Sequence, residues 1–198
     1  GAVLKAVPLR PEADGTFGFD DEELRRAFSP KTRLLMLNTP HNPTGKVFTP
    51  SEMQLLAELC HEHDVIAITD EVYEHMVFDG THIPLACLPE MFERTVTIGS
   101  AGKTFSYTGW KVGWATGPAP IIAAIRTAKQ FLTYVNGAPF QPAVAVGLRL
   151  PNSYFDDLGV EMEAKKTLLC EKLEQAGFGV LAPQGTYFAT ADISKVTK

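Results

Sequence analysis

Short apolar runs alternate along the chain with longer stretches of helical periodicity, and turn residues separate them. The runs are too short for helices, and their alternation with helices is typical of a parallel sheet covered by helices. We therefore predict an α/β fold with a mainly parallel sheet and helices on both faces. The predicted strands are residues 34–37, 65–69, 95–98 and 112–115, together with residues 2–8 at the start of the chain.

Helix signals are clearest at Thr49-Pro50-Ser51-Glu52, which supplies an N-cap residue, a proline for the first turn and the glutamate of a capping box. Pro151-Asn152 interrupts the pattern, so we predict a large domain over residues 1–150 and the start of a smaller α/β domain over 151–198. The predicted helices are residues 50–62, 121–135, 142–148 and 153–175, the last one ending near Gly177. Strands are expected at 178–181 and 186–191.

Composition excludes several classes of partner. The 198 residues carry a formal net charge of −5 with acidic and basic residues interspersed, so neither nucleic acid nor an anionic membrane is an expected partner. No apolar stretch reaches the roughly 20 residues of a membrane helix. Cys60, Cys87 and Cys170 are too widely spaced for a disulfide framework or a zinc site, which favours the cytoplasm. His61 and His63 lie two residues apart on a predicted helix and point to different sides, so no metal is expected there.

Polar motifs follow three of the predicted strands. They are Asn42-Pro43-Thr44-Gly45, Asp70 with Tyr73 shortly after it, and Ser100-Ala101-Gly102-Lys103. Open α/β sheets bind ligands at the edge formed by the carboxyl ends of their strands. The motifs are therefore predicted to form one site.

The chemistry of these residues fits pyridoxal 5′-phosphate (PLP). A PLP enzyme needs a lysine amine that holds the aldehyde as a Schiff base and moves protons, and Lys103 can serve. It also needs a carboxylate facing the pyridine nitrogen, for which Asp70 is the candidate. Further donors are expected from Asn42 and Tyr73 to the phenolic oxygen of the ring, and from Ser100 and Lys111 to the phosphate. Gly109 and Gly113 would let the backbone approach the cofactor.

Four motifs stand in an order that resembles one family. They are Asn42-Pro43-Thr44-Gly45, Asp70-Glu71-Val72-Tyr73, Ser100-Ala101-Gly102-Lys103 and Gly109-Trp110-Lys111-Val112-Gly113. The chain resembles the middle of a fold-type I, class I/II PLP-dependent aminotransferase over almost its whole length. Within that family it is most similar to the kynurenine, methionine and succinyldiaminopimelate aminotransferase subgroup.

The resemblance implies transfer of an amino group from an amino acid to an α-keto acid through a Lys103 Schiff base, in a homodimer. It also implies a cis peptide at Asn42–Pro43 and places Asn42 near the substrate. Lys111 departs from the commonest family pattern, which has an arginine there; a lysine offers a point charge in place of a two-pronged contact. The phosphate-binding turn, a ring-stacking aromatic and a carboxylate-binding arginine are expected outside this stretch, so the fragment alone is expected to be inactive.

Other functions share some of these residues. A carbon–sulfur β-lyase on the same fold would use the same Lys103, Asp70 and Tyr73. An inactive truncated PLP-fold module is a further alternative. A P-loop nucleotide hydrolase is suggested by residues 99–104, but its pattern needs glycine where Thr97 stands. His41 and residues 134–136 are additional candidates for the pocket wall.

Overall fold

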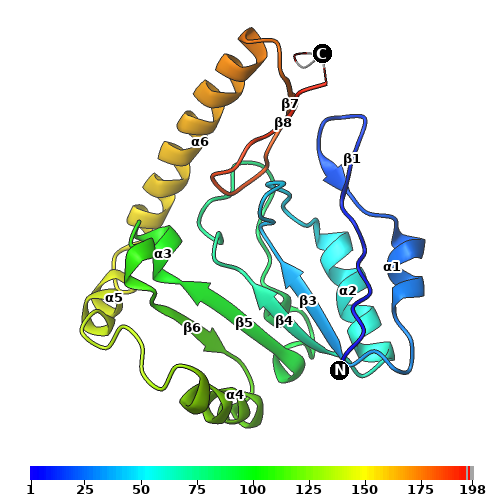
Figure 1. Ribbon diagram of the computed structural model, residues 1–198, viewed down its shortest axis with the longest axis vertical. Coiled ribbons are helices and arrows are strands. Elements are labelled where there is room, and N and C mark those ends of the chain that lie inside the picture. The colour runs from blue at the N-terminus through cyan, green and yellow to red at the C-terminus, as the bar shows by residue number, and fades with distance from the viewer. Residues whose placement is uncertain (195, 197–198) are drawn as a thin grey trace.

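The computed structural model describes residues 1–194 and 196, and a four-stranded sheet lies at its centre (Figure 1). The strand order is β3-β4-β5-β6, with β3 (Leu34–Asn38), β4 (Ile66–Asp70) and β5 (Thr95–Ser100) mutually parallel. The strand β6 (Gly113–Thr116) runs antiparallel to β5. The predicted α/β class and mainly parallel sheet are confirmed.

One face of this sheet shares a core with the helices α1 (Asp21–Ala27) and α2 (Pro50–Glu62). The helix α2 begins as predicted: Thr49 Oγ1 accepts a hydrogen bond from Glu52 N at 3.2 Å, and the Glu52 carboxylate accepts one from Thr49 N at 2.7 Å. Successive side chains of a strand point to opposite faces. The buried set on the helix side includes Met53, Leu56, Cys60, Val65 and Ala67, whereas Leu34, Met36, Ile66 and Ile98 are exposed.

After β5 the chain forms mostly helices. The helix α3 (Ala101–Thr104) follows β5 directly, and α4 (Ala119–Leu132), α5 (Gln141–Gly147) and α6 (Asn152–Gln175) come after β6. Figure 1 shows α6 as a long rod that leads from the α3 and α5 region toward the hairpin of β7 (Gly179–Leu181) and β8 (Thr190–Asp192). A second small pair joins β1 (Arg10–Pro11) and β2 (Phe17–Gly18). Short 3₁₀ helices span Leu85–Cys87, Phe92–Arg94 and Thr108–Trp110.

Three predicted elements differ from the structure. Residues 2–8 form no strand, because no described strand pairs with them, and Val3 is 89% exposed. The strand predicted for 186–191 begins only at Thr190, since Thr186 has a left-handed backbone (φ 69°) and donates its N–H to Met76 O. The helix predicted to reach residue 135 ends at Leu132, two residues before Tyr134 with φ 56°.

The domain division at residue 150 stays a prediction. The helix α6 begins at Asn152 and Gly177 follows its end with φ 91°, as expected of a helix stop. Residues 184–186, beyond α6, nevertheless return to hydrogen-bond with loops that precede residue 80. None of the described helices is both long enough and apolar enough to cross a membrane.

Candidate active site

The predicted site residues gather where β3, β4 and β5 end. Asp70 is the last residue of β4 and Ser100 the last of β5, and Asn42 follows β3 by four residues. Asn38, at the end of β3, connects two of them: its Nδ2 donates to Asp70 O at 2.9 Å and its Oδ1 accepts from Asn42 N at 2.6 Å. The peptide bond Asn42–Pro43 is cis, as expected, and so is Thr39–Pro40. Asn38 was not predicted, although its polar amide directly ends an apolar strand.

Lys103 points its amine toward two tyrosine rings. Its Nζ donates a hydrogen bond to Tyr187 Oη at 2.7 Å. The same nitrogen lies 5.6 Å from the centroid of the Tyr73 ring, within the range of cation–π attraction. The two rings meet edge to face with centroids 5.2 Å apart. Lys103 is half-buried, so its amine is accessible but held in a defined place.

Tyr73 carries a buried hydroxyl that is ready to donate. The residue is 1% exposed, and its Oη has no hydrogen-bond partner among the described residues. Burial, and next the neighbouring Tyr187 hydroxyl, raise the pKa of Tyr73. The hydroxyl therefore keeps its proton at all ordinary pH values. A buried polar atom without a partner is costly, which makes this hydroxyl a contact point for an oxygen of a bound molecule.

Ser100 and Lys111 approach each other through the β5–β6 ladder. Ser100 pairs with Gly113, and Ala101 N donates to Val112 O at 3.1 Å. Ser100 Oγ accepts a hydrogen bond from Gly102 N at 3.1 Å, which leaves its own O–H available as a donor. Lys111 has an exposed side chain and a left-handed backbone with φ 54°. Each of the two residues can thus offer a donor to an anion.

The Asp70 carboxylate makes one long contact. Its Oδ1 accepts from Val72 N at 3.4 Å, near the limit for a hydrogen bond, and the residue is half-buried. No helix follows it, because residues 72–75 form turns. The carboxylate is therefore not committed to capping a helix and can face a cation.

A buried pair of polar side chains lies directly beside Asp70 in the chain. Glu71 Oε2 is 2.8 Å from His82 Nε2, and Thr69 Oγ1 donates to Glu71 Oε1 at 2.7 Å. The side chains of Glu71 and His82 are 1% and 7% exposed. The sequence showed no partner for His82, because the two residues meet only through the loop between them.

The remaining candidates fall near the site in different ways. His41 is half-buried, its Nδ1 lies 2.8 Å from Thr44 Oγ1, and burial lowers the pKa of its ring. Asn136 Nδ2 donates to Lys111 O at 2.8 Å, which brings residues 134–136 beside the predicted phosphate contact. The Tyr134 side chain is 78% exposed and faces solvent.

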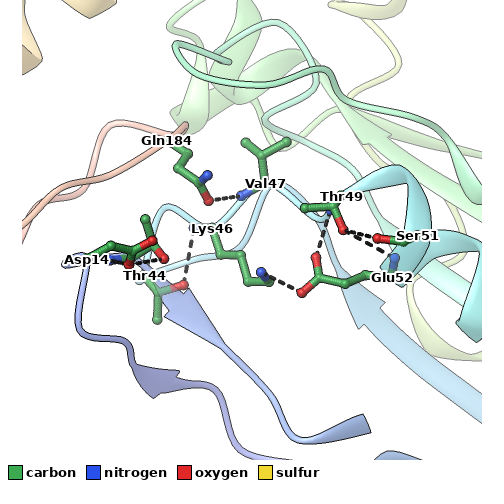
Figure 2. A network of polar contacts seen from close by, with 9 residues as sticks. Asp14, Thr44, Lys46, Val47, Thr49, Ser51, Glu52 and Gln184 are labelled. Carbon is green, nitrogen blue, oxygen red and sulfur yellow. Dashed lines mark hydrogen bonds and ion pairs between the residues drawn. The ribbon is translucent and has the colours of Figure 1, made fainter.

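Tyr187 reaches the site because its loop is fastened to the loop of the Asn42 motif. Figure 2 shows the Gln184 side chain against Val47, whose N–H it accepts at 3.2 Å, next to the ion pair of Lys46 with Glu52 at 2.8 Å. In the backbone, Gln184 N and Gly185 N both donate to Gly45 O, at 3.0 and 2.8 Å. Tyr187 was not predicted, since 84 residues separate it from Lys103.

The chain matches the family model described as "Aminotransferase class I and II" over residues 1–198. The chain belongs to this family. The family assignment that the order of the motifs predicted is thereby confirmed. A nucleotide hydrolase function has no support from the family.

Individual relatives come from the predicted subgroup. The chain is 49% identical over 193 residues to a probable N-succinyldiaminopimelate aminotransferase, DapC, of Mycobacterium tuberculosis. The aligned region covers 97% of this chain and 48% of that protein. The chain is 44% identical to mouse kynurenine–oxoglutarate transaminase 3, covering 99% of this chain and 46% of the relative. The chain thus spans about half the length of the curated relatives it matches.

Solved structures agree with the fold. An N-succinyldiaminopimelate aminotransferase from Mycobacterium tuberculosis superposes with a TM-score of 0.92 at 48% identity, over 96% of this chain and 49% of that one. An Escherichia coli protein whose structure and reactivity identify a methionine aminotransferase function gives 0.86 at 37% identity, over 92% and 48%. The aminotransferase fold of the chain therefore rests on close structural similarity as well as on sequence.

Proposed function

We propose that the complete protein is a PLP-dependent aminotransferase that moves an amino group from an amino acid to an α-keto acid. The observation that carries the proposal is the Lys103 amine at the strand-end edge, beside the partnerless buried hydroxyl of Tyr73. Membership of the class I and II aminotransferases, which depend on PLP, supports the same conclusion.

The donors and charges of the site fit this cofactor. The buried Tyr73 hydroxyl, which lacks a partner among the described residues, suits the phenolic oxygen of the pyridine ring, and Asn42 suits the same oxygen and the substrate beside it. The free O–H of Ser100 and the ammonium of Lys111 suit the phosphate dianion. Lys103 is the residue that would hold the aldehyde. When bound, PLP supplies an aldehyde that takes up the amino group and a ring that accepts electrons from the substrate Cα.

The roles of the residues follow from their charges and positions. The Asp70 carboxylate would hold a proton on the pyridine nitrogen, because a negative charge beside that nitrogen favours its protonated form. The Tyr73 hydroxyl donates to the phenolic oxygen and keeps that oxygen anionic. When Lys103 Nζ is not bonded to the aldehyde, it would take the proton from the substrate Cα and would later return a proton.

We also propose that the complete protein works as a cytoplasmic homodimer on amino acid and α-keto acid substrates. The names of the relatives point to donors of the kynurenine, methionine and succinylated diamino acid types. Cys60, Cys87 and Cys170 are all free, which suits a reducing compartment.

The test is product analysis with the complete protein, PLP, an α-keto acid and each of three donors: kynurenine, methionine and N-succinyldiaminopimelate. The expected result is a new amino acid formed from the keto acid in equal amount to the donor consumed. Lys103→Ala, which lacks the amine, should abolish it, while Lys165→Ala on the exposed face of α6 should not. Release of a thiol with pyruvate from a cysteine conjugate, without amino acid formation, would identify the β-lyase alternative.

A further inference from the structure

The hydroxyl of Tyr187 is hydrogen-bonded to the Lys103 amine, the nitrogen that reacts in the proposed site. Lys103 Nζ donates to Tyr187 Oη at 2.7 Å, and the Tyr187 ring packs edge to face against Tyr73. A second aromatic, Phe188, lies 4.6 Å from the Tyr187 ring, centroid to centroid. The amine is thus held by the hydroxyl of Tyr187 and lies near the ring of Tyr73.

The placement of Tyr187 is specified by its own loop. Thr186 N donates to Met76 O at 2.8 Å, and Phe78 N and Asp79 N donate to Gln184 O at 2.7 and 3.0 Å. These bonds add to those that Gly45 O accepts from the same loop. A Cβ on Gly185 would lie 2.7 Å from Met76 O, so the contact needs a glycine. The residue before Tyr187 is therefore fixed to the turn that carries Tyr73.

We propose that Tyr187 is a positioning residue for Lys103: its hydroxyl accepts a hydrogen bond from the amine and keeps it beside Tyr73 whenever the amine is not bonded to the cofactor. This inference rests on the proposed function, because it assigns Tyr187 a part in the same reaction. In that reaction the lysine is released when the substrate amine displaces it. A released side chain with four rotatable bonds must then stay within reach of the substrate Cα, and the hydrogen bond limits its freedom.

Electrostatics support the contact. Partial burial acts to raise the pKa of Tyr187, but the hydrogen bond from Lys103 and the nearby Tyr73 hydroxyl act in the opposite direction, and the net effect is a lowered pKa. A positive charge beside the hydroxyl stabilises its deprotonated form, which is why the contact lowers the pKa of Tyr187. Removing the cation should therefore raise the pKa of Tyr187.

The kinetic test uses Tyr187→Phe in the complete enzyme with PLP, which keeps the ring and its packing and removes only the hydroxyl. A roughly ten- to hundredfold fall in kcat is expected, the loss typical of one hydrogen bond to a charged group, with little change in KM. The control is Tyr154→Phe, which removes a hydroxyl that donates to Thr104 O and not to the amine. It should leave kcat nearly unchanged. Equal kcat values for Tyr187→Phe and the unaltered enzyme would overturn the proposal.

A second readout needs neither cofactor nor activity. The complete protein is freed of PLP, and the ionisation of its tyrosines is followed by ultraviolet absorbance as the pH rises. The difference between the titration curves of the unaltered protein and of Tyr187→Phe reports the ionisation of the Tyr187 hydroxyl. Lys103→Met is expected to move this titration to higher pH, because it removes the cation that lowers the pKa. An unchanged titration would show that the two side chains do not interact.

The two readouts separate this inference from the proposed function. If amino transfer fails but Lys103→Met shifts the titration, the contact stands and the reaction is a different one. If amino transfer succeeds while both readouts are unchanged, the function stands and the role of Tyr187 falls.

Discussion

At the residue scale, the site combines side chains whose roles follow from local sequence with others that do not. Asp70 and Ser100 could be placed at strand ends from the apolar runs that precede them, and the structure puts them there, with Lys103 in the short helix α3 that follows β5 directly. Tyr187 and His82 could not be found in this way. Tyr187 contacts Lys103 and His82 contacts Glu71, and no local sequence pattern links either residue to its partner.

Asp70 provides the first prediction. Asp70→Asn keeps the shape of the side chain and removes the charge that holds a proton on the pyridine nitrogen. We expect an unchanged circular dichroism spectrum and a fall in kcat by a factor of about 10² or more, as for loss of a preorganised charge. Asp64→Asn, at a side chain that is 95% exposed, is the control and should retain activity. A near-normal rate for Asp70→Asn would refute the role of the carboxylate.

At the scale of elements, capping and turn residues made several helices and strands predictable. The capping box at Thr49 predicted the start of α2, and the helix spans Pro50–Glu62 as expected. The prediction failed where long-range contacts decide the backbone. Thr186 is held in a left-handed conformation by its bond to Met76 O, so the β8 strand starts later than its apolar pattern suggests.

Gly45 tests how the loop that carries Tyr187 is attached. A Cβ on Gly45, where φ is 72°, would lie 2.5 Å from Pro183 Cβ and 2.9 Å from Gly185 O. Gly45→Ala should lower the free energy of unfolding by about 2 kcal/mol or more, since backbone strain and overpacking add. Gly80→Ala is the matched control: φ is 86°, but the nearest atom, Val47 Cγ1, is 3.8 Å away, so only about 1 kcal/mol is expected.

Urea unfolding of the complete protein measures both glycine variants. Gly45→Ala should also lower kcat, because Tyr187 would lose its fixed position, whereas Gly80→Ala should not. Equal destabilisation by the two variants would show that the close approach of the loops does not matter.

The Glu71–His82 pair gives a prediction of stability. In His82→Ala the Glu71 carboxylate stays buried with the Thr69 hydroxyl as its remaining partner, which should cost about 3–5 kcal/mol. Lys165→Ala breaks the exposed pair with Glu161 on α6 and should cost at most about 0.5 kcal/mol. Thermal or urea unfolding compares them. A loss for His82→Ala no larger than that of Lys165→Ala would contradict the structural role of the pair.

At the scale of the whole molecule, several apolar surfaces face solvent. No residue of α4 is buried, and Phe131 and Leu132 are 84% and 80% exposed. Met36, on the open face of the sheet, is 72% exposed. Large exposed apolar patches mark surfaces that bind other protein segments, ligands or membranes. The sequence predicted the helix but could not show what lies against it, because amphipathic periodicity says nothing about the identity of the covering surface.

A homodimer is a further prediction for the complete protein. Analytical ultracentrifugation at micromolar concentration should give the mass of two chains, and dilution that separates the chains should reduce activity. A monomer with full activity would contradict it.

The central claim is that Lys103 is the lysine that holds the cofactor. The most direct test is borohydride treatment of the complete protein with PLP, because borohydride makes the bond between the aldehyde carbon and a lysine amine permanent. Peptide mapping should then find the pyridoxyl group on Lys103, in the peptide that contains Ser100-Ala101-Gly102-Lys103-Thr104, together with loss of the absorbance of the bound cofactor. An absent label, or a label on Lys111 or any other lysine, would contradict the account.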